Sequence, residues 1–126
     1  SANPVGMRAG LVTLRKMKAQ DGWKTLNQKG TQFAKDLSEL FTQAKAQLQV
    51  DNFGSLFWIH QKTEKPIRRI YNIPEAQGQV FKRLFLKCLD KGIYFAPNAY
   101  EVGFLSLAHS ESDLQETLQV IREALS

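Results

Sequence analysis

The first 48 residues carry apolar side chains at helical spacing, and this feature constrains the fold more than any other. Residues 4–20 are expected to form one helix, with Asn3 as its N-cap. Gly22 ends that helix, and a longer one is expected to continue to Leu48, with Gly30 inside it at a cost in helix propensity. The apolar positions of these helices are Met7, Leu11 and Leu14, and then Trp23, Leu26, Phe33, Leu37, Leu40, Ala44 and Leu48.

The middle of the chain changes to signals for turns and strands. Asp51-Asn52 is typical of a turn. Phe53 to His60 is rich in aromatic and branched residues and predicts a strand. The polar segment 62–74 contains two prolines and is expected to be a loop or an irregular edge.

The last third of the chain predicts a helix over 76–91, followed by short strands over 93–96 and 103–108. Ser110 and Asp113 resemble a capping box that opens a final amphipathic helix. The expected order is α-α-β-α-β-β-α. Because the strands mostly follow one another through turns, this order predicts an α+β fold with a small antiparallel sheet covered by helices.

The length of 126 residues suits one compact domain over 1–126. No apolar run approaches the roughly 20 residues that span a bilayer, and no secretory signal is visible, so we expect no membrane partner. A single cysteine, Cys88, fits a reducing compartment such as the cytoplasm. The net charge of +5 is compatible with nucleic-acid binding, but the cationic residues are scattered, which favours a solvated surface and no nucleic-acid partner.

Few residue types with catalytic or ligand chemistry stand at useful spacing. His60 and His109 are far apart and no cysteine or carboxylate accompanies them at ligand spacing, so no metal site is expected. Cys88 falls on the apolar side of its helix, which favours packing over nucleophilic catalysis. The basic segment 62–69 lies near Trp58 and Tyr71, a pattern that can bind single-stranded nucleic acid, although a solvated loop is the favoured interpretation.

Glu101 is the acid of most interest, because its sequence neighbours are almost all apolar. A carboxylate on a loop among apolar groups either faces solvent or lies in a cleft. Composition alone favours the solvent-facing alternative. His109 follows a strand at a helix start and is expected to have a structural role.

Three stretches together resemble one enzyme family. Ser1-Ala2-Asn3-Pro4 resembles the Ser-Gly-Asn-Pro helix opening of class III aminotransferases, which belong to pyridoxal-phosphate fold type I. Residues 92–97 and 100–109, with the sequences Gly-Ile-Tyr-Phe-Ala-Pro and Tyr-Glu-Val-Gly-Phe-Leu-Ser-Leu-Ala-His, resemble the C-terminal signature of its aminomutase branch, the glutamate-1-semialdehyde 2,1-aminomutases. Ala2, Asn98 and Val102 depart from the residues usual at their positions.

The resemblance implies the C-terminal small domain of a cytoplasmic homodimer that uses pyridoxal 5'-phosphate to form 5-aminolevulinate, the tetrapyrrole precursor. Glu101 matches the family's glutamate that reaches toward substrate amino groups. The Schiff-base lysine, the aspartate that pairs with the pyridine nitrogen and a phosphate-contacting threonine would precede Ser1. We therefore expect no catalytic and no cofactor-binding residue here, and no activity from this chain alone.

Two alternatives remain open from the sequence. The chain could come from another class III aminotransferase, acting on an ornithine-like or γ-amino acid. It could also be a stand-alone α+β binding module, and the positive net charge is the only observation that favours this alternative. The absence of an initiator methionine favours a piece of a longer chain over the stand-alone module.

Overall fold

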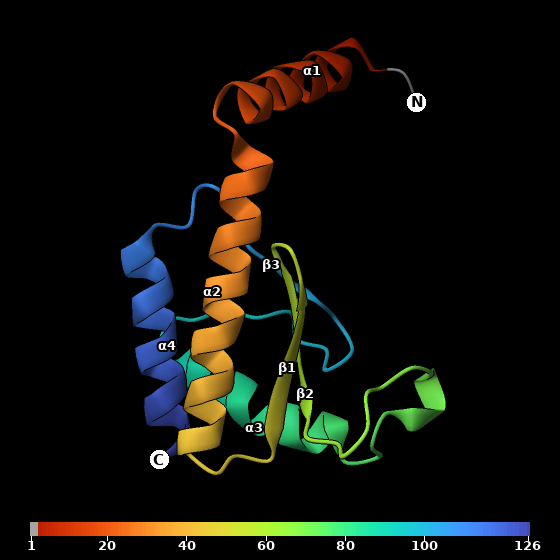
Figure 1. The fold of residues 1–126 in the computed structure, drawn as a ribbon, viewed down its shortest axis with the longest axis vertical. Coiled ribbons are helices and arrows are strands. Elements are labelled where there is room, and N and C mark those ends of the chain that lie inside the picture. Colours follow the sequence, from red (N-terminus) through yellow and green to blue (C-terminus); the bar gives the residue numbers. More distant parts are fainter. Residues whose placement is uncertain (1–2) are drawn as a thin grey trace.

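A computed structural model describes residues 3–126 of the chain (Figure 1). The first helix, α1 (Pro4–Ala19), begins as expected: the Asn3 side chain accepts a hydrogen bond from the Val5 N–H, and Pro4 occupies the first turn. Ser1 and Ala2, which begin the aminotransferase-like motif, lie outside the described residues.

Helix α2 (Gly22–Gln43) follows after one residue in the left-handed region, Asp21. It ends earlier than the sequence suggests, because Lys45 adopts a positive φ of 50° and reverses the chain. Leu48, expected on this helix, instead opens the first strand. The prediction of a helix to Leu48 was wrong because the position of Leu48 fits both patterns. Leu48 follows Ala44 by four residues, as in a helix, and precedes Val50 by two, as in a strand.

The strands β1 (Leu48–Phe53) and β2 (Leu56–Gln61) form an antiparallel hairpin in which Phe53 pairs with Leu56. Asp51-Asn52 lies inside β1, so the turn predicted there was wrong. Gly54, with a φ of 58°, makes the turn two residues later. Pairing with β2 overrides the turn preference of Asp51-Asn52, which only the folded context supplies.

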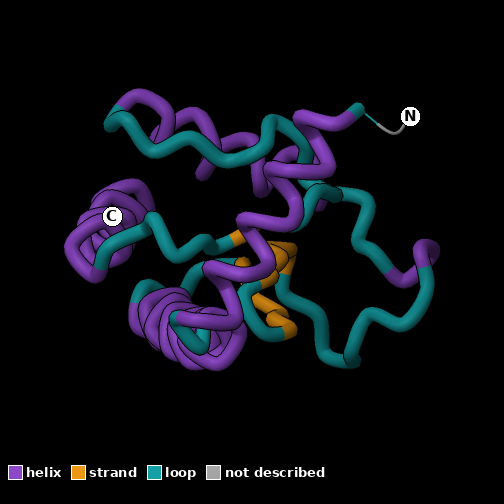
Figure 2. The backbone as a smooth tube through the Cα atoms, turned by 90° about the horizontal axis from the view of Figure 1, so that it is seen from above, coloured by secondary structure: helices purple, strands orange, loops and turns teal. Residues whose placement is uncertain are grey.

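A loop with a short 3-10 turn, η1 (Ile70–Asn72), follows β2 and leads to helix α3 (Gln77–Asp90). Figures 1 and 2 both show this loop reaching away from the rest of the molecule. Gly92, with a φ of 85°, ends the helix. Residues 93–96 form no strand, contrary to prediction, because the Ile93 N–H bonds back to the Cys88 carbonyl at the helix end.

The last strand, β3 (Gly103–Phe104), pairs antiparallel with β2 at Leu56 and Phe57. It is shorter than the predicted 103–108 because residues 106–109 fold into a turn, in which the Ser106 N–H donates to His109 Nδ1. Helix α4 (Glu111–Leu125) then opens with the predicted capping box between Ser110 and Asp113. The sheet order is β1-β2-β3, an antiparallel sheet in an α+β fold as predicted.

Helices α2, α3 and α4 enclose the core against one face of the hairpin (Figure 2). Strand alternation places Leu48, Phe57 and Ile59 on that face, while Trp58 and His60 point to the other. The most deeply buried apolar side chains are Leu37, Cys88 and Ile121, one from each of the three helices. Burial of these apolar faces is the main stabilising term of the fold.

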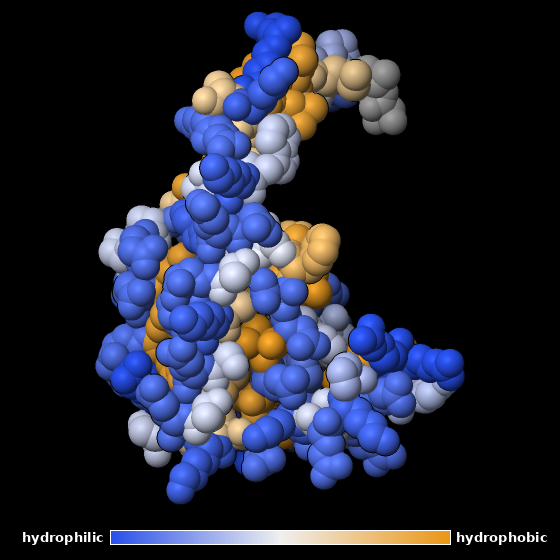
Figure 3. Space-filling model, in the orientation of Figure 1, coloured by the Kyte–Doolittle hydropathy of each residue, from blue (hydrophilic) through white to orange (hydrophobic). Residues whose placement is uncertain are grey.

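Helix α1 stands outside this body and has no buried residue. Figure 3 shows apolar side chains on its surface, and Val5, Met7 and Leu14 are each more than half exposed. The helical face predicted from Met7, Leu11 and Leu14 is therefore present but covers no part of the core. Across residues 3–126, none of the helices combines the length and the apolar character needed to cross a bilayer.

Candidate functional site

Glu101 lies on the segment that connects residue 97 to β3. Two hydrogen bonds to Asn98, one to its side chain and one to its carbonyl, shape this segment into a turn. The Asn98 side chain accepts from the Tyr100 N–H at 3.0 Å, and the Asn98 carbonyl accepts from the Glu101 N–H at 3.1 Å. The backbone of Glu101 is thus fixed, while its side chain keeps its own torsions.

The Glu101 side chain is exposed, as composition alone favoured. Its surroundings are unusual for an exposed acid, because three aromatic residues near it in the sequence are also largely exposed: Tyr94 at 69%, Tyr100 at 57% and Phe104 at 65%. Exposed large apolar groups are typical of a surface that binds a ligand or another protein surface. The segment therefore has the composition of one wall of a site.

Ala99, in the middle of this segment, is buried and ties it to the rest of the fold. Its carbonyl accepts hydrogen bonds from Trp58 Nε1 at 3.0 Å and from Gln77 Nε2 at 2.7 Å. The sequence did not single out Gln77, and it indicated Trp58 only as a neighbour of the basic segment 62–69. A signal for Gln77 does exist: it shares a helical face with Phe81, Leu84 and Cys88, and a polar residue on a buried face needs a hydrogen-bond partner.

His109 belongs to the turn before α4. Its Nδ1 accepts from the Ser106 N–H at 3.0 Å, and its carbonyl accepts from the Lys29 amine on α2. These bonds give His109 a structural place at the start of α4, with β3 between it and the Glu101 turn. The hydrogen bonds from the Ser110 side chain and backbone lower the pKa of Asp113 in the same turn.

The other candidates for chemistry are separated from Glu101. Cys88 is fully buried in the core, and desolvation by burial raises the pKa of its thiol to about 11, so the side chain packs as a small hydrophobe. His60 is also fully buried: Nδ1 lies 2.8 Å from the Gln61 carbonyl and Nε2 lies 3.3 Å from Asp51 Oδ2. Within residues 3–126 no three His, Cys, Asp or Glu side chains gather as metal ligands.

The basic segment 62–69 lies on the projecting loop. Arg69 bonds to the Tyr71 hydroxyl, and its guanidinium lies 5.7 Å from the centre of the Tyr71 ring. Trp58, which the sequence placed near this segment, is on the sheet and bonds to Ala99 instead. The loop therefore presents Tyr71 with basic side chains, whereas Trp58 contributes to the Glu101 turn.

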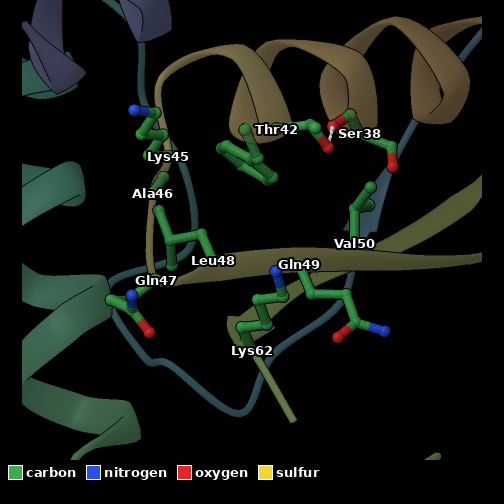
Figure 4. A pocket seen from close by; sticks show the side chains of 10 residues that line it. Ser38, Thr42, Lys45, Ala46, Gln47, Leu48, Gln49, Val50 and Lys62 are labelled. Atoms are coloured by element: carbon green, nitrogen blue, oxygen red, sulfur yellow. Dashed lines mark hydrogen bonds between the residues drawn. The ribbon is translucent and has the colours of Figure 1, made fainter. Parts of the chain in front are cut away.

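A hollow of about 550 Å³ lies between the end of α2 and β1 (Figure 4). Thr42 donates a hydrogen bond to the Ser38 carbonyl beside it, and Lys45 and Lys62 are its charged residues. No carboxylate, histidine or cysteine lines it, so it holds none of the groups that an acid–base or nucleophilic reaction needs. Glu101 does not line this hollow. The lining residues are Ser38, Phe41, Thr42, Lys45, Ala46, Gln47, Leu48, Gln49, Val50 and Lys62.

Known proteins resemble the chain over nearly all of its length. No family model matches it. Over 98% of this chain, it is 53% identical to a glutamate-1-semialdehyde 2,1-aminomutase from Bdellovibrio bacteriovorus, of which it covers 29%. It is 43% identical over 99% of its length to the protein of the same name from Leptospira biflexa, of which it covers 30%. The chain thus spans less than a third of the curated relatives it matches.

Solved structures with the same fold are transaminases and aminomutases. An omega-transaminase from Sphaerobacter thermophilus superimposes with a TM-score of 0.85 at 27% identity, over 98% of this chain and 28% of that one. A glutamate-1-semialdehyde aminomutase from Pseudomonas aeruginosa gives a TM-score of 0.70 at 16% identity, over 83% and 23%, which shows a shared fold. By sequence, this chain is similar to one segment of the curated glutamate-1-semialdehyde 2,1-aminomutases, and it shares its fold with one segment of solved transaminases.

Proposed function

We propose that this chain is the C-terminal domain of a glutamate-1-semialdehyde 2,1-aminomutase, which forms 5-aminolevulinate from glutamate-1-semialdehyde in tetrapyrrole synthesis. The observation that carries this proposal is the 53% identity over 124 residues with a curated protein of that name. The whole protein would be a pyridoxal-phosphate enzyme and a homodimer of the cytoplasm. The amino group of the five-carbon substrate would move from C2 to C1.

The described residues do not by themselves fit pyridoxal phosphate. The cofactor needs an amine for its aldehyde and an acid for its ring nitrogen. The Lys29 amine already donates to the His109 carbonyl, and the hollow that holds Lys45 and Lys62 has no carboxylate in its lining. We therefore assign no cofactor contact to this chain, and the remaining 70% or so of such a protein would have to supply them.

Glu101 would contribute a substrate contact. A carboxylate held at a fixed backbone position can bind an ammonium group through charge-assisted hydrogen bonds. Tyr100, the adjacent residue, is more than half exposed and supplies apolar surface next to Glu101, and covering that surface would exclude water and strengthen the contact. Holding the diamine form of the substrate in place would prevent its loss before the second transfer.

The test uses the whole protein with glutamate-1-semialdehyde as substrate. We expect 5-aminolevulinate from the unmodified protein, and slower turnover or faster release of the intermediate from Glu101→Gln. Glu64→Gln, a change of another exposed glutamate on the projecting loop, serves as the matched control and should leave both quantities unchanged. Normal turnover and normal retention of the intermediate in Glu101→Gln would remove the substrate role from Glu101.

A second candidate is an aminotransferase that passes the amino group to a separate acceptor. The omega-transaminase favours it, because its TM-score of 0.85 exceeds the 0.70 of the aminomutase structure. The two functions differ in stoichiometry: an aminomutase needs no second substrate, whereas an aminotransferase needs an amino donor and an acceptor. Failure to form 5-aminolevulinate, together with transfer to an added keto acid, would replace the first proposal by the second.

A further inference from the structure

Gln77 is a fully buried polar residue that joins three parts of the fold. Its Oε1 accepts from the Gln61 N–H at the end of β2, and its Nε2 donates to the carbonyls of Ile59, at 3.3 Å, and Ala99, at 2.7 Å. The side chain thus uses its acceptor and both donor directions. A glutamine satisfied in this way at the start of α3 has its position set by the sheet.

Trp58 provides a second and independent link to the same carbonyl. Its Nε1–H donates to the Ala99 oxygen at 3.0 Å, while its ring packs against His60 with 4.6 Å between ring centres. The Ala99 carbonyl therefore accepts two hydrogen bonds from different elements. Two such bonds restrain both the position and the direction of a peptide group, which one bond would not do.

Glu101 lies two residues beyond Ala99, inside the same turn. The bonds from Tyr100 and Glu101 to Asn98 carry the restraint along the backbone. From Gln77 to the Glu101 Cα there is thus a continuous series of hydrogen bonds and fixed dihedral angles. A group that contacts substrate must be held to within about 0.5 Å, and an error of about 1 Å can lower a rate about 100-fold.

We propose that Gln77 and Trp58 are positioning residues, which hold the Ala99 carbonyl so that Glu101 meets the substrate amino group in the correct place. This inference rests on the proposed function, since it takes Glu101 as the substrate contact. Neither residue touches substrate. Their contribution passes entirely through the backbone of residues 98–101.

Trp58→Phe is the main variant, because it removes the bond to Ala99 while it keeps a smaller aromatic ring on the sheet beside His60. Gln77→Met removes the other bond to Ala99 with little change of volume, although it also frees the Gln61 N–H and the Ile59 carbonyl. The matched controls are Trp23→Phe, an exposed tryptophan on α2, and Gln79→Met, an exposed glutamine on α3.

Two measurements on the whole protein test the proposal. The first is kcat and KM for 5-aminolevulinate formation, alone and combined with Glu101→Gln. We expect Trp58→Phe to lower kcat/KM about 10-fold in the unmodified background and less than about 3-fold when Glu101 is already Gln, because a positioning residue acts only through the group it positions. A purely structural role would give equal losses in both backgrounds and would overturn the proposal.

The second measurement is hydrogen exchange of the peptide containing residues 98–101, which does not depend on activity. We expect at least 3-fold faster exchange in Trp58→Phe and Gln77→Met, and no change in the two controls. If the protein forms no 5-aminolevulinate, the proposed function is wrong, and exchange still decides whether the turn is held as described. Unchanged exchange in both variants would overturn the positioning role itself.

Discussion

Replacing Gly30 by alanine should destabilise this protein, although alanine is the better helix former. Gly30 lies in the interior of α2, where it packs against the hairpin turn. A Cβ atom at this position would lie 2.0 Å from the Gly54 carbonyl oxygen and 2.8 Å from Ser55 Cα. Both are backbone atoms, so no side chain can rotate away to make room.

The size of the effect follows from two opposing terms. Alanine gains about 1 kcal/mol of helix propensity over glycine. Overpacking of a well-filled interior costs about 1–3 kcal/mol, and more where the backbone must move. The distance of 2.0 Å must grow to the ordinary contact distance of about 3.5 Å, which separates α2 from the turn between β1 and β2. We expect a net loss of about 2 kcal/mol in the free energy of unfolding.

Urea and thermal unfolding followed by circular dichroism measure this loss. For a domain of this size about 2 kcal/mol corresponds to a fall of about 8 °C in Tm. The matched control is Gly78→Ala in the first turn of α3, where a Cβ atom would meet nothing within 4 Å. It should raise the free energy of unfolding by about 0.5–1 kcal/mol. A Gly30→Ala protein as stable as the Gly78→Ala protein would refute the close approach of α2 and the turn.

Two further predictions concern titratable side chains. Cys88 should resist a thiol reagent at about pH 8 until the protein unfolds, because burial raises its pKa to about 11 and the thiolate is the reactive form; rapid labelling of the native protein with one reagent molecule would contradict this. The pKa of Asp113 is lowered in the folded protein, mainly by the Ser110 hydroxyl, so its stabilising effect is present above the unfolded pKa and is lost as the pH falls through the folded value. Asp113→Asn should therefore lower Tm at neutral pH and leave a shallower decrease of Tm from about pH 5 to about pH 3; parallel Tm curves for the two proteins would show that Asp113 does not contribute.

Elements with local signals were predictable from the sequence. The Asn3 cap and the Ser110–Asp113 capping box each act within a few residues, and both occur where expected. The hairpin was only half predicted, because β1 depends on its pairing with β2. Asp51 and Asn52 favour turns in isolation, but in the fold they lie opposite Trp58 and Phe57.

The candidate site divides in the same way. Glu101 was found through a sequence motif. It lies on an exposed turn, and its aromatic neighbours Tyr100 and Phe104 are also exposed. Gln77 and Trp58 lie far from it in sequence, and their link to Ala99 exists only after α3 and the sheet have packed together. The position of Gln77 on the buried face of α3 indicates that its side chain has a hydrogen-bond partner, but it does not indicate which carbonyl is that partner.

The exposed helix α1 has a consequence for how this chain can be oriented by its surroundings. None of its residues is fully buried, and it joins α2 through Gln20 and Asp21, of which Asp21 has a φ of 49°. Rotation about the dihedral angles of these linker residues would change the direction of the 16-residue helix α1 without disturbing any core contact. The core therefore does not determine the direction of α1. A surface that covers Val5, Met7 and Leu14 would determine it, so two proteins with identical cores could hold α1 at different angles.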